Sequence, residues 1–335
     1  MPSISILIPT LNSERVLQQC LESIAAQDYP SDQVEIIIAD GGSTDETLAI
    51  ARRYTSSIFP NPLKTGEAGK AVALQHATGE IVAFIDSDNI LPTTDWLSRM
   101  IAPFADEEIV GTEPLEYTYR KEDSYITRYC ALMGMNDPLC LFLGNYDRYC
   151  TLTGEWTEMP VEIVDQSSYL KATLQPPYLP TIGANGFLVR RTALTEWQTQ
   201  DYFFDIDVVH ELASKTKCQV GKVKVGIVHI FSGSVTTFVR KQQRRVNDYL
   251  YYRAFGLRKY QWQKTNRAGL VKFILSCVFV LPLVMQSARG WKRKPDVAWL
   301  FHPLACWITL ATYGSETIRA FLFGMQTQSR AEWKQ

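Results

Sequence analysis

Two carboxylates one residue apart are the side chains of this sequence best suited to chemistry. Asp86 and Asp88 directly follow the apolar run at residues 81–85, where a buried strand would reach its carboxyl end. Alternate residues of an extended chain point the same way, and paired carboxylates suit Mg²⁺ or Mn²⁺, which can neutralise a nucleotide diphosphate. The alternative is an ordinary polar turn after a strand, and the motif alone does not decide between the two.

Polar residues also end the two strands expected before this point. The apolar runs at residues 4–8 and 34–39 predict strands, which are followed by Thr10 and Asn12 and by Asp40. Helical spacing of apolar residues separates the runs, so strand and helix alternate and predict parallel pairing in an α/β sheet. The carboxyl ends of parallel strands form one ligand crevice, where we expect these side chains and the aspartate pair to converge.

The size and charge of the chain indicate a catalytic domain with an appendage. Its 335 residues, 46% of them hydrophobic, suffice for a large core. From residue 240 onward 17 Lys or Arg accompany four acidic residues, which gives about +13 and leaves about −14 on residues 1–239. Seven cysteines without CxxC spacing predict reduced thiols in a cytosolic setting, and no secretion signal is recognisable.

Four motifs together resemble the family 2 glycosyltransferases of the GT-A fold. They are Ile-Pro-Thr-Leu-Asn at residues 8–12, Ala-Asp-Gly-Gly-Ser-Thr-Asp-Glu-Thr at 39–47, Gly-Lys-Ala at 69–71 with Ala-Thr-Gly-Glu at 77–80, and Phe-Ile-Asp-Ser-Asp-Asn at 84–89. The resemblance covers roughly residues 3–235. It implies a Rossmann-like, mostly parallel sheet flanked by helices, in a catalytic domain at residues 1–239 with a nucleotide-binding half at 1–115 and an acceptor half at 116–239.

The resemblance also implies a nucleotide-sugar site at the ends of the first two strands. The matching residues are Pro9, Thr10, Asn12, Glu14 and Asp40. Asp40 is suited to accept from a uracil or guanine N–H. Lys70 matches a basic residue of the family whose charge could reach the nucleobase or a phosphate, unless it is a solvated helix lysine. Asp88, with Asp86 directly or through the ribose, is expected to hold the Mg²⁺ or Mn²⁺ that stabilises the leaving diphosphate. His229 is either a further metal or phosphate contact or a core histidine.

A second set of family motifs implies an acceptor site. The Gly-Ala-Asn-Gly segment resembles the family's acceptor glycine segment and provides Asn185 and Gly186. The family's Glu-Asp pair is Phe-Asp here, which leaves Asp205 as the matching base for the attacking hydroxyl as the sugar carbon inverts. Asp207 is the alternative base, or only a helix cap. A phosphate acceptor, already ionised at neutral pH, would need no base.

The basic C-terminal region predicts contact with a membrane. Gln242 and Arg245 match part of the QxxRW motif of processive and lipid-directed relatives, and they are expected to meet the diphosphate or the acceptor unless they form a basic helix face. Residues 240–267 are expected to form a basic amphipathic interface segment. Aromatic and cationic residues alternate within it from Tyr249 to Trp262, for which lipid headgroups are a better partner than nucleic acid. Two hydrophobic helices are expected within residues 268–325, before a tail at 326–335.

The two apolar runs, at residues 270–288 and 297–314, are near the lower length limit for crossing a bilayer. If both crossed from a cytosolic domain, the basic stretch between them would lie on the far side, against the positive-inside rule. We therefore expect monotopic attachment to the cytoplasmic face of the cell membrane, with a transmembrane hairpin or a soluble helical subdomain as alternatives.

The residues and the resemblance together predict a metal-dependent, inverting glycosyltransferase that uses a nucleotide-diphosphate sugar and a lipid-linked or glycan acceptor. A nucleotidyltransferase is the rival enzyme, although residues 9–14 lack the glycine-rich basic loop it would normally need. A catalytically inactive membrane scaffold of the same fold is the third possibility. The intact Asp86, Asp88 and Asp205 argue against it.

Overall fold

The computed structural model describes residues 1–215, 217–254 and 266–324, which form two compact units. The first unit holds described residues of 1–115 and 161–229, and the second those of 116–160 and 230–324. This grouping differs from the predicted halves at 1–115 and 116–239, because residues 116–160 share a core with the C-terminal helices. Residues 255–265 of the predicted interface segment and the tail at 326–335 lie outside the described residues.

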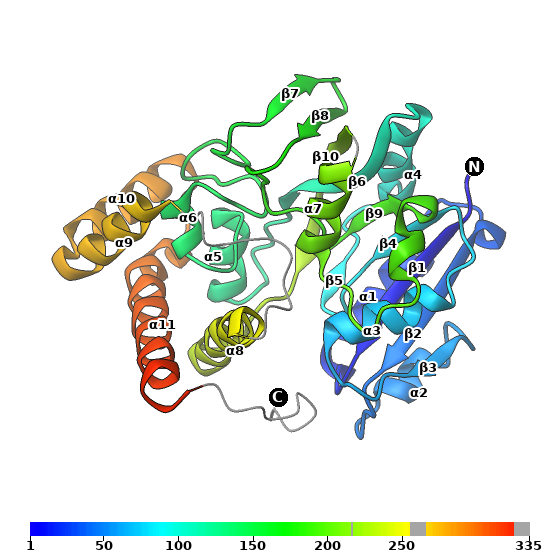
Figure 1. Cartoon of the computed structure of the whole chain (residues 1–335), viewed down its shortest axis with the longest axis horizontal. Coiled ribbons are helices and arrows are strands. Elements are labelled where there is room, and N and C mark those ends of the chain that lie inside the picture. The colour runs from blue at the N-terminus through cyan, green and yellow to red at the C-terminus, as the bar shows by residue number, and fades with distance from the viewer. Residues whose placement is uncertain (216, 255–265, 325–335) are drawn as a thin grey trace. The chain divides into compact units, whose positions relative to one another are not determined.

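The first unit is built on a central sheet flanked by helices (Figure 1). Its strands are β1 (Ile4–Thr10), β2 (Val34–Asp40), β3 (Ile58–Pro60), β4 (Ile81–Phe84), β5 (Asn89–Ile90), β6 (Ile109–Tyr117), β7 (Glu162–Asp165), β8 (Tyr169–Leu174), β9 (Phe187–Arg190) and β10 (Cys218–His229). Its helices are α1 (Glu14–Ala25), α2 (Thr47–Ala51), α3 (Gly66–Gln75), α4 (Trp96–Ile101) and α7 (Asp205–Lys215). The strand order is β3-β2-β1-β4-β9-β6-β10-β8-β7, and β5 pairs with β10.

The sheet is mixed, whereas the sequence predicted mostly parallel strands. The first four strands pair in parallel, with β1 between β2 and β4 and β3 beside β2. The pairs β4–β9, β6–β9, β8–β10 and β7–β8 are antiparallel. Parallel pairs need crossover connections, usually helical, and the regular alternation of strand and helix stops after β4.

The second unit is helical and has one apolar core. Its helices are α5 (Tyr125–Met133), α6 (Leu139–Leu143), α8 (Val235–Ala254), α9 (Arg267–Phe279), α10 (Leu281–Arg293) and α11 (His302–Phe323). Buried side chains from α5, α8 and α9, among them Tyr129, Phe238 and Phe273, join Trp299 and Phe301 in a single cluster. All seven cysteines of the chain are free.

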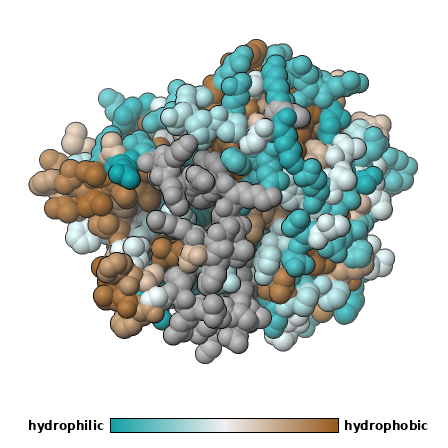
Figure 2. All heavy atoms as spheres, in the orientation of Figure 1, coloured by the Kyte–Doolittle hydropathy of each residue, from teal (hydrophilic) through white to brown (hydrophobic). Residues whose placement is uncertain are grey.

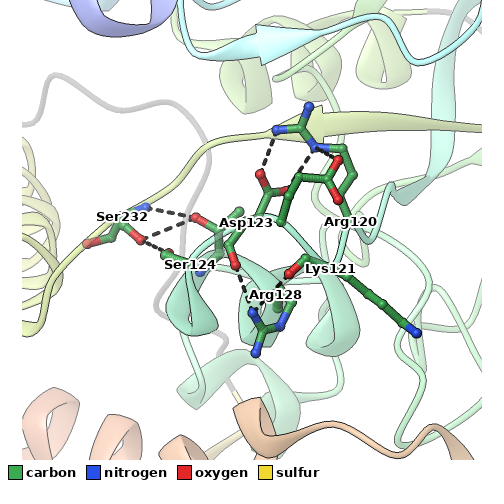
Figure 3. A network of polar contacts seen from close by, with 8 residues as sticks. Arg120, Lys121, Asp123, Ser124, Arg128 and Ser232 are labelled. Carbon is green, nitrogen blue, oxygen red and sulfur yellow. Dashed lines mark hydrogen bonds and ion pairs between the residues drawn. The ribbon is translucent and has the colours of Figure 1, made fainter.

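A polar network holds the start of α5 (Figure 3). Arg120 pairs with Asp123 at 2.6 Å, and Ser124 caps α5 while its hydroxyl donates to the carbonyl of Ser232. Arg128 donates to the carbonyl of Asp123 at 2.8 Å. The network therefore ties α5 to the segment that leads into α8, although the two are more than one hundred residues apart.

The first apolar run is not one helix but two. Helices α9 and α10 are bent by 96° at Val280, which has a φ of 60°, and Pro282 lies in the first turn of α10. A proline ring clashes with a preceding helical turn, so the sequence cannot continue α9 through this point. Among the described residues no single helix is long and apolar enough to cross a membrane. Only α9 and α10 taken together have the length and composition of a membrane span, and they are bent.

Candidate active site

Hydrogen bonds join the carboxyl ends of β1, β2 and β4 in the first unit. The hydroxyl of Thr10 donates to Asp40 Oδ1 at 2.9 Å, because the two residues are partners in the parallel register. The hydroxyls of Ser13 and Ser87 lie 3.1 Å apart and bring the loop after β1 to the aspartate pair. The structure thus brings together the strand ends at which the sequence predicted a ligand crevice.

Lys70 on α3 links two of the predicted site carboxylates. Its Nζ lies 2.9 Å from Asp205 Oδ2 and 3.8 Å from Asp86 Oδ1, and its side chain is 7% exposed, so it is not a solvated helix lysine. Helix α3 approaches β1 closely here, since a Cβ on Gly69 would lie 2.7 Å from the Cβ of Pro9. The predicted contacts to a nucleobase or phosphate would have to compete with these ion pairs.

Burial and charge act in opposite directions on this ion pair. Burial raises the pKa of the Asp205 carboxyl to about 6, although the Lys70 ammonium opposes the rise. Burial alone would lower the pKa of Lys70, but the charges of Asp205 and Asp86 outweigh it and hold that pKa above its usual range. A carboxylate with this proton affinity can serve as a general base near neutral pH.

Asp88 and His229 form the candidate metal position. Their Oδ2 and Nε2 atoms lie 3.5 Å apart, because β5 pairs with β10 and sets Asn89 opposite His229. Two ligands about 2.1 Å from one ion at right angles are about 3 Å apart, so this pair fits Mg²⁺ or Mn²⁺. No group of three or more His, Cys, Asp or Glu that could hold a metal is found among the described residues, so Asp88 and His229 would leave coordination positions that oxygen ligands such as phosphate could fill.

Asp40 is saturated by its own turn. It accepts hydrogen bonds from the hydroxyls of Thr10 and Ser43 and from the backbone N–H groups of Gly42 and Ser43. A carboxylate offers about four acceptor positions, so a nucleobase N–H would have to displace one of these donors. These hydrogen bonds indicate that Asp40 stabilises the turn that follows β2.

Asn12 and Glu14, also predicted to bind the nucleotide, brace the loop after β2. Asn12 Oδ1 accepts from the backbone N–H of Thr44 at 2.9 Å, and Glu14 Oε2 accepts from that of Glu46 at 3.1 Å. Both side chains remain exposed at the same edge of the sheet.

Asn61 is a candidate ligand contact that sequence reasoning missed. It is 3% exposed, its amide nitrogen donates to the carbonyl of Thr65, and its Oδ1 has no partner among the described residues. With Asp40, Phe59 and Lys64 it lines a cavity of about 700 Å³. An unsatisfied buried oxygen costs about 1–3 kcal/mol, so a ligand with an N–H would stabilise this position. The Asn-Pro pair after the third strand was the available signal.

The acceptor glycine segment packs against Asp205. Gly183 and Gly186 have φ values of 126° and 91°, and a Cβ on Gly183 would lie 2.6 Å from the Cβ of Asp205. Asn185 is buried and accepts from the side-chain nitrogen of Asn89 at 3.0 Å. The segment therefore connects the aspartate loop to the candidate base. Asp207, the alternative base, is 6% exposed in the first turn of α7.

A fully buried ion pair supports the same segment. Lys222 Nζ lies 2.6 Å from Glu113 Oε2, and the side chains are 0% and 1% exposed. Glu113 Oε1 accepts from the backbone N–H of Gly183 at 2.9 Å. Neither residue belongs to a family motif quoted above, and their partnership across β6 and β10 is set by the sheet alone.

Replacing Lys222 by Met should lower the free energy of unfolding by about 3–5 kcal/mol, because the Glu113 carboxylate is left buried without its cation. The shift of the urea unfolding midpoint measures this loss. The double variant Lys222→Met with Glu113→Gln keeps an acceptor for Gly183 and should recover most of the stability. A single variant as stable as the wild type would show that the charge of Glu113 is met elsewhere.

Gln242 and Arg245 lie on α8 in the second unit. Gln242 is fully buried, its nitrogen donates to the carbonyl of Asn136 at 2.8 Å, and its oxygen accepts from Tyr313 and Arg245. Arg245 Nη1 lies 3.9 Å from Asp137 Oδ2, and its side chain is 39% exposed. Gln242 thus joins helices within its unit, and of the two only Arg245 keeps surface for an anion.

Residues 5–150 match the sequence model described as glycosyl transferase family 2. The chain is 27% identical over 143 residues to glycosyltransferase AglE of Haloferax volcanii, which covers 40% of this chain and 46% of that protein. It is 37% identical over 97 residues to the poly(ribitol-phosphate) β-N-acetylglucosaminyltransferase TarS of Staphylococcus aureus, which covers 27% of this chain and 17% of that protein. The chain thus spans less than half the length of these curated relatives.

A solved structure shares the fold. A mannosyltransferase from Pyrobaculum calidifontis, in complex with GDP-mannose and Mn²⁺, superposes with a TM-score of 0.52 at 16% identity, covering 94% of this chain and 88% of that one. The likeness shows a mixed α/β architecture of the GT-A type with a central sheet flanked by helices.

Proposed function

Residues 5–150 belong to the family 2 glycosyltransferases, and from this premise we propose that the chain transfers a sugar from a nucleotide-diphosphate sugar to an acceptor held at a membrane. One observation carries the proposal. Asp86 of the aspartate pair and Asp205 both contact the buried Lys70 ammonium, at 3.8 and 2.9 Å.

Asp88, with His229 and Asp86, would hold Mg²⁺ or Mn²⁺ at this edge. When bound, the ion supplies a Lewis acid that stabilises the charge of the departing nucleoside diphosphate. The carboxylate and imidazole donors fit such an ion, and the mannosyltransferase of the same fold carries Mn²⁺ with its donor. The nucleobase is proposed to bind in the cavity lined by Asn61 and Asp40. Asn61 Oδ1 has no hydrogen-bond partner among the described residues and could accept from an N–H of the base.

Asp205 is the proposed base of an inverting transfer. Its carboxylate would take the proton of the acceptor hydroxyl while Lys70 keeps it oriented, and Gly183 leaves the space that this orientation needs. Donor phosphates would compete with Asp205 for the Lys70 ammonium. Binding of the donor would therefore weaken the ion pair of Asp205 and free its carboxylate to accept a proton. Asn185 and Gly186 hold the acceptor segment in place.

The acceptor is proposed to be lipid-linked, or a glycan on a lipid carrier, at the cytoplasmic face of the cell membrane. Two features support this: the C-terminal charge of about +13 and the exposed apolar surface of the second unit (Figure 2). The large apolar side chains exposed on α9, α10 and α11 include Leu270, Val271, Ile274, Leu275, Val278, Phe279, Leu281, Val284, Met285, Leu304, Trp307, Ile318, Phe321, Leu322 and Phe323. Arg245 on α8, with its side chain 39% exposed, is proposed to contact an anionic group of the acceptor.

A donor panel with purified protein tests the proposal. The protein is incubated with UDP- and GDP-sugars, with Mg²⁺, Mn²⁺ or EDTA, and with lipid extracts as acceptors. Release of free nucleoside diphosphate that requires the metal is the expected result. Release of pyrophosphate would favour the nucleotidyltransferase, and no turnover of any donor would favour the scaffold.

A further inference from the structure

We infer that the bend between α9 and α10 inserts, tip first, into one leaflet of an anionic membrane. The inference rests on the proposed membrane attachment and goes beyond it by naming the inserting element. We define the tip as residues 278–285, where the two helices meet.

The tip exposes four apolar side chains by more than half. Val278, Phe279, Leu281 and Met285 are each 62–68% exposed, which is unfavourable in water for so many neighbouring apolar residues. Val280 adopts a φ of 60°, a conformation that β-branched residues rarely take, and so fixes the bend in place. The apolar surface is therefore presented by a preformed corner rather than by a straight helix.

The cationic residues of α9 and α10 lie outside the tip, where lipid headgroups could contact them. Residues 267–293 contain five cations and no acidic residue. The cations are Arg267, Lys272, Arg289, Lys292 and Arg293, and all lie outside the tip. Anionic lipid headgroups match this pattern, whereas a second copy of the same surface would set cations against cations.

The dimensions of the hairpin fit one leaflet. Each helix has 13 residues, which is about 20 Å at 1.5 Å per residue. For two arms bent by 96° and set symmetrically about the membrane normal, the tip would reach about 14 Å below the arm ends. Half of a hydrocarbon core of about 30 Å is nearly the same depth, so the tip fills one leaflet and leaves Arg267, Lys292 and Arg293 at its surface. The long side chains of Lys272 and Arg289 can reach back to the headgroups.

The arms are braced from within the second unit. Phe273 is buried with its ring 5.2 Å from that of Phe142, and a Cβ on Gly269 would lie 2.2 Å from the Phe142 carbonyl oxygen. A Cβ on Gly290 would lie 2.5 Å from the ring of Trp299. Because both arms pack this tightly, the hairpin enters lipid as a rigid body and loses little conformational entropy.

Vesicle flotation tests the inference with full-length protein. Vesicles of phosphatidylcholine with about 30% phosphatidylglycerol are compared with pure phosphatidylcholine. The double variant Phe279→Asp with Leu281→Asp should lose about a hundredfold in partition to both. The variant Arg289→Gln with Lys292→Gln should lose about tenfold, and only on the anionic vesicles. The matched control Ile163→Asp with Val164→Asp alters apolar residues of β7 that are 41% and 47% exposed, and it should bind like the wild type.

The depth of two labels in the membrane distinguishes tip-first insertion from helices that lie flat on the surface. A fluorophore on Leu281→Cys should be quenched by bromines on the lipid acyl chains, and one on Trp291→Cys by a headgroup quencher. Equal depth for the two labels overturns the inference, as does full vesicle binding by the tip variant. A soluble dimer that the tip variant dissociates, without vesicle binding by the wild type, would assign the surface to a second copy.

Donor turnover in detergent keeps this test apart from that of the proposed function. The tip variant should turn over donor at the wild-type rate, because the tip lies in the second unit and holds no proposed site residue. Loss of vesicle binding with intact turnover supports the inference. A wild type without turnover that still inserts would remove the proposed enzyme and leave the membrane element standing.

Discussion

Asp88→Asn should lower the rate of sugar transfer about a thousandfold and abolish the effect of Mn²⁺ on donor binding. Asn keeps the size of the side chain but removes the negative charge that would pair with the proposed ion; Asp88 Oδ2 lies 3.5 Å from His229 Nε2. Loss of about 4 kcal/mol of charge stabilisation for the leaving diphosphate corresponds to this factor. Released nucleoside diphosphate gives kcat/KM, and calorimetry with and without Mn²⁺ gives the binding of donor.

Asp95→Asn is the matched control, because this carboxylate lies on the same unit, 49% exposed, just before α4. It should leave both quantities unchanged. An Asp88→Asn enzyme that transfers sugar normally would remove the metal assignment. One that loses transfer but keeps Mn²⁺-dependent donor binding would move the ion to Asp86 and leave Asp88 another role.

Local signals suffice for the parallel part of the fold. Each of β1, β2 and β4 is an apolar run with a polar end, and the helices between them show helical spacing in the sequence. Among the antiparallel strands, β7 carries a weaker signal, since it is exposed along its whole length and has no apolar face to bury. Nothing local indicates that residues 116–160 share a core with Phe273 and Trp299, because that grouping depends on contacts more than one hundred residues apart.

The candidate site likewise contains some contacts that the sequence predicted and others that it did not. Strand ends predicted that Thr10, Asp40 and the aspartate pair would converge; in the structure Thr10 hydrogen-bonds to Asp40, and Ser13 contacts Ser87, which lies between the two aspartates. The ion pairs of Lys70 with Asp205 and of Lys222 with Glu113 join residues 135 and 109 positions apart, so neither could be predicted from spacing. The sequence also did not indicate that donors of its own turn occupy the acceptor positions of Asp40. This depends on the φ of 87° at Gly42 and on the direction of the N–H groups of Gly42 and Ser43.

Asp205→Asn should lower transfer to a hydroxyl acceptor about a thousandfold and leave donor binding within about threefold. In the proposed mechanism the carboxylate acts only when the acceptor loses its proton, and removal of a general base typically costs 10²–10⁴ in rate. Asn still accepts a hydrogen bond from Lys70, so the helix should remain in place. Transfer rate and donor affinity, measured on the same preparation, separate this role from a structural one.

The pH dependence decides whether Asp205 is the base. A base with a pKa of about 6 must be ionised to act, so kcat/KM should rise about tenfold per unit below pH 6 and level off above it. Asp205→Asn should remove this limb, whereas Asp207→Asn should keep it. If the limb survives in Asp205→Asn and disappears in Asp207→Asn, Asp207 is the base. If transfer is fast and flat in both variants, the acceptor arrives already ionised, as a phosphate would.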